Sequence, residues 1–127
     1  MVESGKVKVL VADDEHVIAD TLAMILNHSG YDARAVYSGE DAVEVADTFR
    51  PSLIISDVVM GGITGIEASI KIQSKQPACK VLLFSGQAAT TGLLEEARAQ
   101  GYDFELLAKP VHPGDLLAKL RERELQA

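Results

Sequence analysis

Five short apolar segments are spaced along the chain, and longer stretches with helical periodicity separate them. The apolar segments cover residues 7–12, 33–36, 53–56, 81–85 and 104–108. The first, third and fourth are apolar with little alternation, a pattern typical of strands that are buried on both faces of a parallel sheet. The pattern therefore predicts five strands, the inner ones covered on both sides.

Apolar residues recur every three or four positions after each strand segment, so each predicted strand is followed by a predicted helix. Residues that favour helix starts and ends occur at the expected places. The clearest of these are Ser29-Gly30 at a helix end, Ser38 with Asp41 and Thr64 with Glu67 at helix starts, and Pro113 in the first turn of the last helix.

The order strand–helix, repeated five times, predicts the fold class. It indicates an α/β protein with a five-stranded parallel sheet and helices on both faces, a doubly wound (βα)5 fold of the flavodoxin type. The crossover connections should be right-handed. We expect one domain over residues 6–124, an N-terminal extension over residues 1–5, and no output domain in this chain.

Composition and charge narrow the function. The chain has 127 residues, 47% of them hydrophobic, with a formal net charge of −7, which argues against direct binding to nucleic acid or a membrane surface, since both are anionic. The single cysteine, Cys79, precedes an apolar segment and is expected to be a buried, unreactive thiol. The first residues do not resemble a signal peptide, and no apolar segment approaches the length of a membrane span, so we expect a cytoplasmic protein.

Polar and charged side chains follow four of the predicted strands. The carboxyl ends of parallel strands form the edge at which ligands bind in open α/β sheets. Taken alone, each residue has a purely structural interpretation: an acid at a helix start, a loop carboxylate, a turn cap or a surface lysine. Their combination at four strand ends favours one shared site composed of Asp13, Asp14, Asp57, Ser85 and Lys109.

The chemistry of this set is coherent. Neighbouring carboxylates repel one another, by about 4 kcal/mol for a unit-charge pair at 4 Å and an effective dielectric of 20, and a divalent cation removes that repulsion. Mg²⁺ prefers oxygen ligands and is often held by one or two carboxylates together with a phosphate. Asp57 would then be an exposed carboxylate nucleophile that forms an acyl phosphate, with Lys109 and Ser85 contacting the phosphoryl oxygens.

The segments VLVADDE, LIISDVVM with the following Gly65, LLFSG and LLAKP together resemble the receiver domain of two-component response regulators. The resemblance extends from about residue 7 to residue 120. It implies that Asp57 accepts a phosphoryl group from a sensor histidine kinase or a phosphotransfer protein. It also implies that Asp13, Asp14, Asp57 and the backbone carbonyl of Val59 bind Mg²⁺ or Mn²⁺.

The resemblance implies further roles at the same edge of the sheet. Ser85 matches the switch residue that turns inward on phosphorylation, and Lys109 matches the lysine that contacts the phosphoryl group. Such a domain is a regulatory phosphoacceptor that catalyses only its own phosphorylation and dephosphorylation. Its phosphorylated form would act on a downstream protein or on an output domain absent from this chain.

Three features depart from the usual pattern of the family. Leu106 occupies a switch position that is often aromatic, Gly61-Gly62 replaces a common proline after Met60, and Val59 is apolar where some relatives are polar. Because glycine is conformationally permissive, the loop containing residues 61 and 62 is expected to be more mobile without metal.

Other functions remain open on the sequence. Leu106 is compatible with a constitutive interaction module that does not switch. A phosphatase with Asp57 as nucleophile would usually carry a second aspartate at the position of Val59. A nucleotide site is disfavoured, because the acidic segment after the first strand lacks a glycine-rich cradle. His16 lies close to the acidic pair but is expected to face solvent rather than bind metal.

Overall fold

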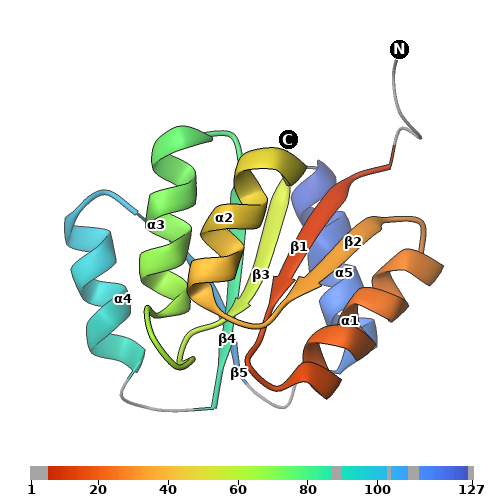
Figure 1. Cartoon of the computed structure of the whole chain (residues 1–127), viewed down its shortest axis with the longest axis horizontal. Coiled ribbons are helices and arrows are strands. Elements are labelled where there is room, and N and C mark those ends of the chain that lie inside the picture. The colour runs from red at the N-terminus through yellow and green to blue at the C-terminus, as the bar shows by residue number, and fades with distance from the viewer. Residues whose placement is uncertain (1–5, 87–89, 103, 109–111, 126–127) are drawn as a thin grey trace.

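The computed structural model describes residues 6–86, 90–102, 104–108 and 112–125. Within these ranges, strands and helices alternate along the whole chain (Figure 1). The strands are β1 (Lys8–Ala12), β2 (Asp32–Val36), β3 (Leu53–Asp57), β4 (Lys80–Ser85) and β5 (Glu105–Ala108). The helices are α1 (His16–His28), α2 (Gly39–Phe49), α3 (Gly65–Lys75), α4 (Thr90–Ala99) and α5 (Pro113–Leu125). Each predicted strand is confirmed, with boundaries that shift by at most one residue.

The strands form one parallel sheet in the order β2-β1-β3-β4-β5. The chain first adds β2 on one side of β1 and then crosses to the other side for β3. The order therefore reverses at β1 and β3, whose carboxyl ends form the switch point at which open α/β sheets bind ligands. The predicted doubly wound fold is confirmed.

Helices cover both faces of the sheet, as expected for a parallel sheet. α2, α3 and α4 pack on one face, where Leu10, Ile54 and Leu83 are buried in the core. α1 and α5 pack on the other face, around Val11 and Ile55. Alternate residues of the central strands thus enter two separate apolar cores, which explains why these strands show so little polar alternation.

The helix boundaries follow the predicted signals. Ser38 caps α2, since its hydroxyl accepts a hydrogen bond from the backbone N–H of Asp41 at 3.0 Å. Thr64 and Glu67 form a capping box at the start of α3, where each side chain accepts from the backbone N–H of the other residue. Gly30 follows α1 with φ of 99°, a conformation that favours glycine.

The edge strand β2 is covered by a side chain that imitates a neighbouring strand. The amide group of Asn27 in α1 accepts a hydrogen bond from Ala33 N at 2.8 Å and donates one to Ala33 O at 3.1 Å. Edge strands otherwise present free backbone groups that can pair with another chain. Asn27 therefore satisfies the backbone N–H and C=O of one residue on an edge that would otherwise favour pairing with another chain.

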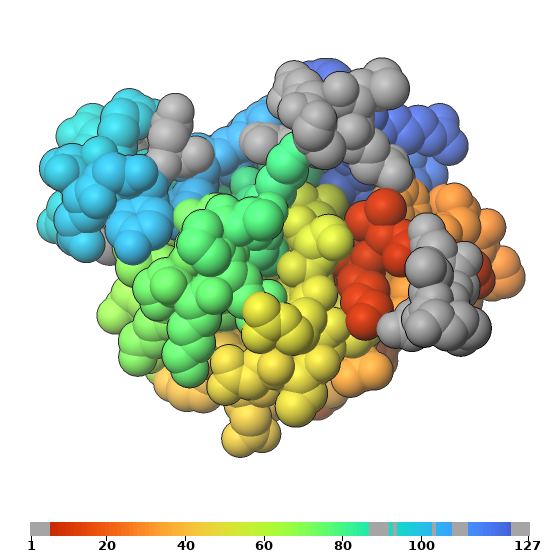
Figure 2. Space-filling view, turned by 90° about the horizontal axis from the view of Figure 1, so that it is seen from above, coloured from red at the N-terminus to blue at the C-terminus, as the bar shows by residue number. Residues whose placement is uncertain are grey.

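Figure 2 shows the end of the sheet where the strands begin, opposite the carboxyl ends. The α2–β3 connection (yellow) lies beside the α3–β4 connection (green), and residues of both line a pocket of about 330 Å³. Cys79 lines this pocket but is itself buried, and burial raises the pKa of its thiol to about 11. The prediction of a buried, unreactive cysteine is consistent with this environment.

Among the residues that the structure describes, no helix has the length and apolar character needed to cross a membrane.

Candidate functional site

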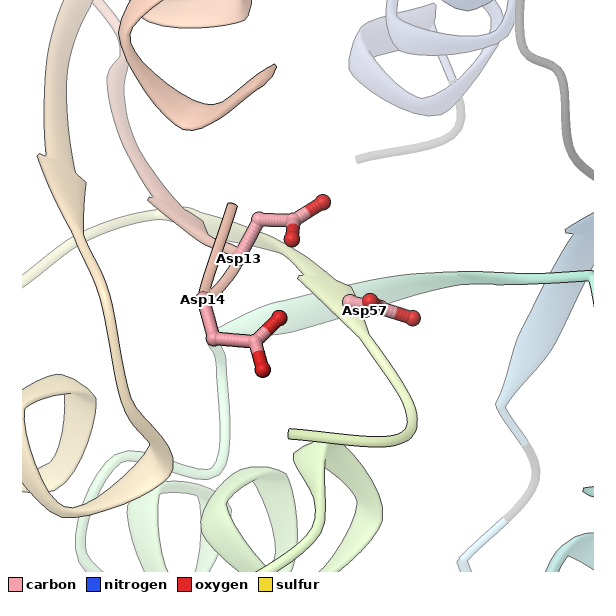
Figure 3. Close-up of side chains that lie close together, drawn as sticks. All are labelled: Asp13, Asp14 and Asp57. Carbon is pink, nitrogen blue, oxygen red and sulfur yellow. The ribbon is translucent and has the colours of Figure 1, made fainter. Parts of the chain in front are cut away.

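Three aspartates lie together at the carboxyl ends of neighbouring strands. Asp13 and Asp14 follow β1, and Asp57 is the last residue of β3. One carboxylate oxygen from each lies within 4.8 Å of the others (Figure 3). The structure thus brings these three predicted site residues together.

The register of the sheet explains this arrangement. Ala12 of β1 pairs with Ser56 of β3 in parallel alignment, so the next residues, Asp13 and Asp57, lie at the same height on adjacent strands. Asp13 is fully buried, and its Oδ1 atom accepts a hydrogen bond from the backbone N–H of Glu15 at 2.9 Å. The turn after β1 thus orients the first carboxylate, while Asp14 remains exposed.

The expectation that Asp57 is exposed is wrong for the residue as a whole, of which 7% is accessible. The reason is its position in the central strand. β1 and β4 flank it, with Phe84 as its partner on β4. On a third side, Gly65 at the start of α3 packs against its carbonyl oxygen.

The electrostatics of the group fit a divalent cation. All three side chains offer carboxylate oxygens, and two of the three residues are buried. Buried like charges at this spacing repel each other strongly, because the protein interior screens them less than water does. A Mg²⁺-sized ion among them offsets that repulsion and accepts an all-oxygen ligand set. The residues present therefore fit the cofactor that the sequence predicts.

Ser85 and the end of β5 lie at the same edge of the sheet. Ser85 is buried at the end of β4, one residue beyond the partner of Asp57. It pairs with Ala108 at the end of β5. Lys109 and Pro110, which follow in sequence, lie outside the described residues, so the predicted role of Lys109 stays a prediction.

The segment after Asp57 leads directly into α3. Val58 is buried, and its backbone N–H donates to Phe84 O at 3.2 Å. Its carbonyl accepts from Gly65 N at 2.8 Å, which closes the base of the β3–α3 loop, residues 58–64. Val59 lies within this loop with 43% of its surface exposed. An apolar side chain is thus presented to solvent two residues after the central carboxylate.

His16 forms an aromatic contact that the sequence did not predict. The residue is exposed in the first turn of α1, and its ring stacks on Tyr37 with centroids 3.8 Å apart. The Tyr37 hydroxyl donates to Asp20 Oδ1 at 2.6 Å, and this hydrogen bond raises the pKa of Tyr37. Within the described part of the chain, the candidate metal group contains aspartates and not His16. The expectation that His16 faces solvent is confirmed.

Leu106 lies in β5, paired with Leu83 of β4, and is 38% exposed. The predicted switch position is therefore occupied by a partly exposed aliphatic side chain. Phe104, two residues earlier, is buried against the core beneath α4. The two residues therefore differ in depth, although only two positions separate them.

Comparison with known proteins identifies the family. The family model of the response regulator receiver domain matches residues 9–121. The transcriptional regulatory protein PdtaR of Mycobacterium tuberculosis is 37% identical over 126 residues, which cover 94% of this chain and 60% of PdtaR. The probable transcriptional regulatory protein TcrX of the same species is 30% identical over 115 residues, 91% of this chain and 48% of TcrX. The chain thus spans about half to three fifths of these relatives.

Solved structures agree with this match. The Vibrio cholerae chemotaxis protein CheY4 has a TM-score of 0.82 and 28% identity, covering 93% of this chain and 98% of CheY4. The Thermotoga maritima response regulator protein TrrA, solved in complex with Mg²⁺ and BeF, has a TM-score of 0.78 and 27% identity, covering 91% of this chain and 97% of TrrA. Since the family match extends over nearly the whole chain and these folds coincide with it, the protein belongs to the receiver domain family of two-component response regulators.

Proposed function

We propose that Asp57 is the phosphoacceptor of this receiver domain and that Mg²⁺ bound beside it supports the reaction. The observation that carries the proposal is the group of three aspartates whose carboxylate oxygens lie within 4.8 Å of one another at the switch point of the sheet. Asp13, Asp14 and Asp57 would hold the ion, with the backbone carbonyl of Val59 as a further ligand. Mn²⁺ satisfies the same oxygen donors.

The reaction is a transfer of one phosphoryl group. A carboxylate oxygen of Asp57 attacks phosphorus, the P–N bond of a donor phosphohistidine breaks, and the electron pair of that bond returns to the imidazole nitrogen. When bound, Mg²⁺ supplies positive charge to the phosphoryl oxygens. Ser85 donates its hydroxyl hydrogen to one of these oxygens, and Lys109 contributes its ammonium group.

The phosphorylated form acts as a signal. Attraction of Ser85 to the phosphoryl group moves the end of β4 towards Asp57. Leu106 on the adjacent strand β5 then repacks against the shifted strand. The donor is a sensor histidine kinase or a phosphotransfer protein, and the recipient is a downstream protein or an output domain. We place this exchange in the cytoplasm.

Beryllofluoride, which imitates a phosphoryl group on an aspartate, tests this proposal. With Mg²⁺, it should shift amide NMR signals around Asp57 and Ser85 and also those of β5 near Leu106. Asp57→Asn should abolish all of these shifts. Asp47→Asn is the matched control, because Asp47 is an exposed carboxylate of α2 that pairs with Lys75 at 3.5 Å.

The pattern of shifts also distinguishes the phosphorylation switch from the second candidate function. Shifts confined to residues next to Asp57 would favour a constitutive interaction module, a possibility raised by the leucine at position 106. Shifts that reach β5 support the switch.

A further inference from the structure

A carboxylate from α2 holds the loop that follows the candidate phosphoacceptor. The backbone N–H of Ile63, in the β3–α3 loop, donates to Glu40 Oε2 at 3.1 Å. The next amide, that of Thr64, donates to Glu67 Oε1 at 3.0 Å. The Glu67 contact belongs to the local capping box, whereas Glu40 reaches the loop from a different helix, 23 residues earlier in the chain.

Two glycines permit this contact, one on each side of it. Gly39 precedes Glu40 at the start of α2, and a Cβ atom there would lie 2.6 Å from Ile63 Cγ1 and 2.9 Å from Ile63 O. Gly62 precedes Ile63 with φ of 89°, and a Cβ atom there would overlap the Glu40 carboxylate. The helix start and the loop are therefore in close complementary contact, and the contact does not depend on one hydrogen bond alone.

This contact restrains a loop that its sequence makes permissive. The loop contains two consecutive glycines, Gly61 and Gly62, and both widen the range of backbone conformations available without the tertiary contact. The base of the loop is closed by the bond from Gly65 N to Val58 O. The Glu40 contact fixes a second point near the other end, at Ile63, with Val59 between the two.

We propose that Glu40 is a positioning residue that presets the β3–α3 loop, and with it the backbone carbonyl of Val59, for metal binding. This inference rests on the proposed function, because it assigns that carbonyl to the metal site. A tertiary hydrogen bond thus restrains a loop that Gly61 and Gly62 make permissive. Glu40 itself contributes no ligand.

The charge of Glu40 must be separated from its hydrogen bond, since an additional carboxylate near an acidic site could also attract cations. Glu40→Gln removes the charge but keeps a side-chain oxygen that can accept from Ile63 N–H. Glu40→Ala removes both. Glu44→Ala is the matched control, because Glu44 is an exposed carboxylate one turn further along α2.

The affinity of the full chain for Mn²⁺, followed by the electron paramagnetic resonance of free Mn²⁺, provides the test. Mutation of residues that orient metal ligands typically lowers the affinity for the metal by about 10- to 100-fold. Because Glu40 acts one step further away, through the loop, we expect Glu40→Ala to weaken binding about threefold to tenfold. Glu40→Gln and Glu44→Ala should bind almost as the unchanged protein does. Excess Mg²⁺ should restore the rate at which Glu40→Ala is labelled by acetyl phosphate.

A second variant disturbs the same contact without altering Glu40. Gly39→Ala keeps Glu40 but pushes against Ile63, so it should weaken Mn²⁺ binding in the same direction, with thermal unfolding measured alongside. Unchanged affinity in Glu40→Ala, or equal loss in Glu40→Ala and Glu40→Gln, would overturn the positioning role while leaving the proposed function intact. Absence of Mn²⁺ binding by the unchanged protein would overturn both.

Discussion

Gly65, the first residue of α3, packs directly against the backbone carbonyl oxygen of Asp57. A Cβ atom at Gly65 would overlap that oxygen and would also lie 2.6 Å from Ser56 Oγ. The Ser56 hydroxyl itself donates to the same carbonyl at 2.8 Å. The glycine therefore lets α3 begin immediately behind the candidate phosphoacceptor, and the helix start fixes the backbone from which the Asp57 side chain projects.

Gly65→Ala should destabilise the protein, because the nearest atom that the new methyl group meets, the carbonyl oxygen of Asp57, belongs to the backbone and cannot rotate away. Overpacking of this kind typically costs about 1–3 kcal/mol in the free energy of unfolding. Urea unfolding measures the change. Gly92→Ala in α4 is the control, since a Cβ atom there meets nothing within 4 Å and should stabilise the helix by about 0.5–1 kcal/mol. Equal stability of the two variants would contradict the close packing at Gly65.

Val59→Asn should shorten the lifetime of the phosphorylated protein. Val59 is 43% exposed beside the site, and its apolar side chain cannot hydrogen-bond an attacking water molecule, whereas asparagine can. The loss of phosphate after removal of the donor, followed over time, measures the effect, and we expect several-fold faster loss. If the unchanged protein loses its phosphate rapidly and the variant loses it at the same rate, the side chain at position 59 does not control the attacking water.

The thiol of Cys79 should resist alkylation in the folded protein. Its pKa is raised from 9.0 to about 11 by burial, so little reactive thiolate is present near neutral pH. Iodoacetamide should label it slowly in native protein and quickly after unfolding. Equal labelling rates in the two states would contradict the burial of this side chain.

The same shift predicts a dependence of stability on pH. Below about pH 9, the Cys79 thiol is protonated in both states and contributes nothing. Between pH 9.0 and about 11, the unfolded chain releases this proton while the folded protein retains it, so the free energy of unfolding falls as the pH rises. Because other groups titrate there too, the test is the difference from Cys79→Ala, which should lose less stability over this range.

The fold followed from local patterns in the sequence. Apolar segments without alternation predicted the inner strands, and the capping residues Ser38 and Thr64 marked helix starts that the structure confirms. The acidic group was predictable for a geometric reason. Once β1 and β3 are parallel neighbours, residues at their carboxyl ends, such as Asp13 and Asp57, must lie side by side.

Contacts between distant segments could not be predicted in the same way. Glu40 has the sequence context of an ordinary acid in the first turn of a helix, and its contact with Ile63 depends on how α2 meets the β3–α3 loop. The stacking of His16 on Tyr37 likewise joins α1 to the end of β2. Gly65 was visible in the sequence, but its packing against Asp57 required the position of α3.

The central claim is that Asp57 accepts the phosphoryl group, and covalent labelling tests it most directly. Acetyl phosphate with Mg²⁺ should add one phosphoryl group per chain, detected by the intact mass. Asp57→Asn should carry none, whereas Asp47→Asn should be labelled as the unchanged protein is. Label that survives in Asp57→Asn, or an unchanged protein that takes no label, would contradict the account.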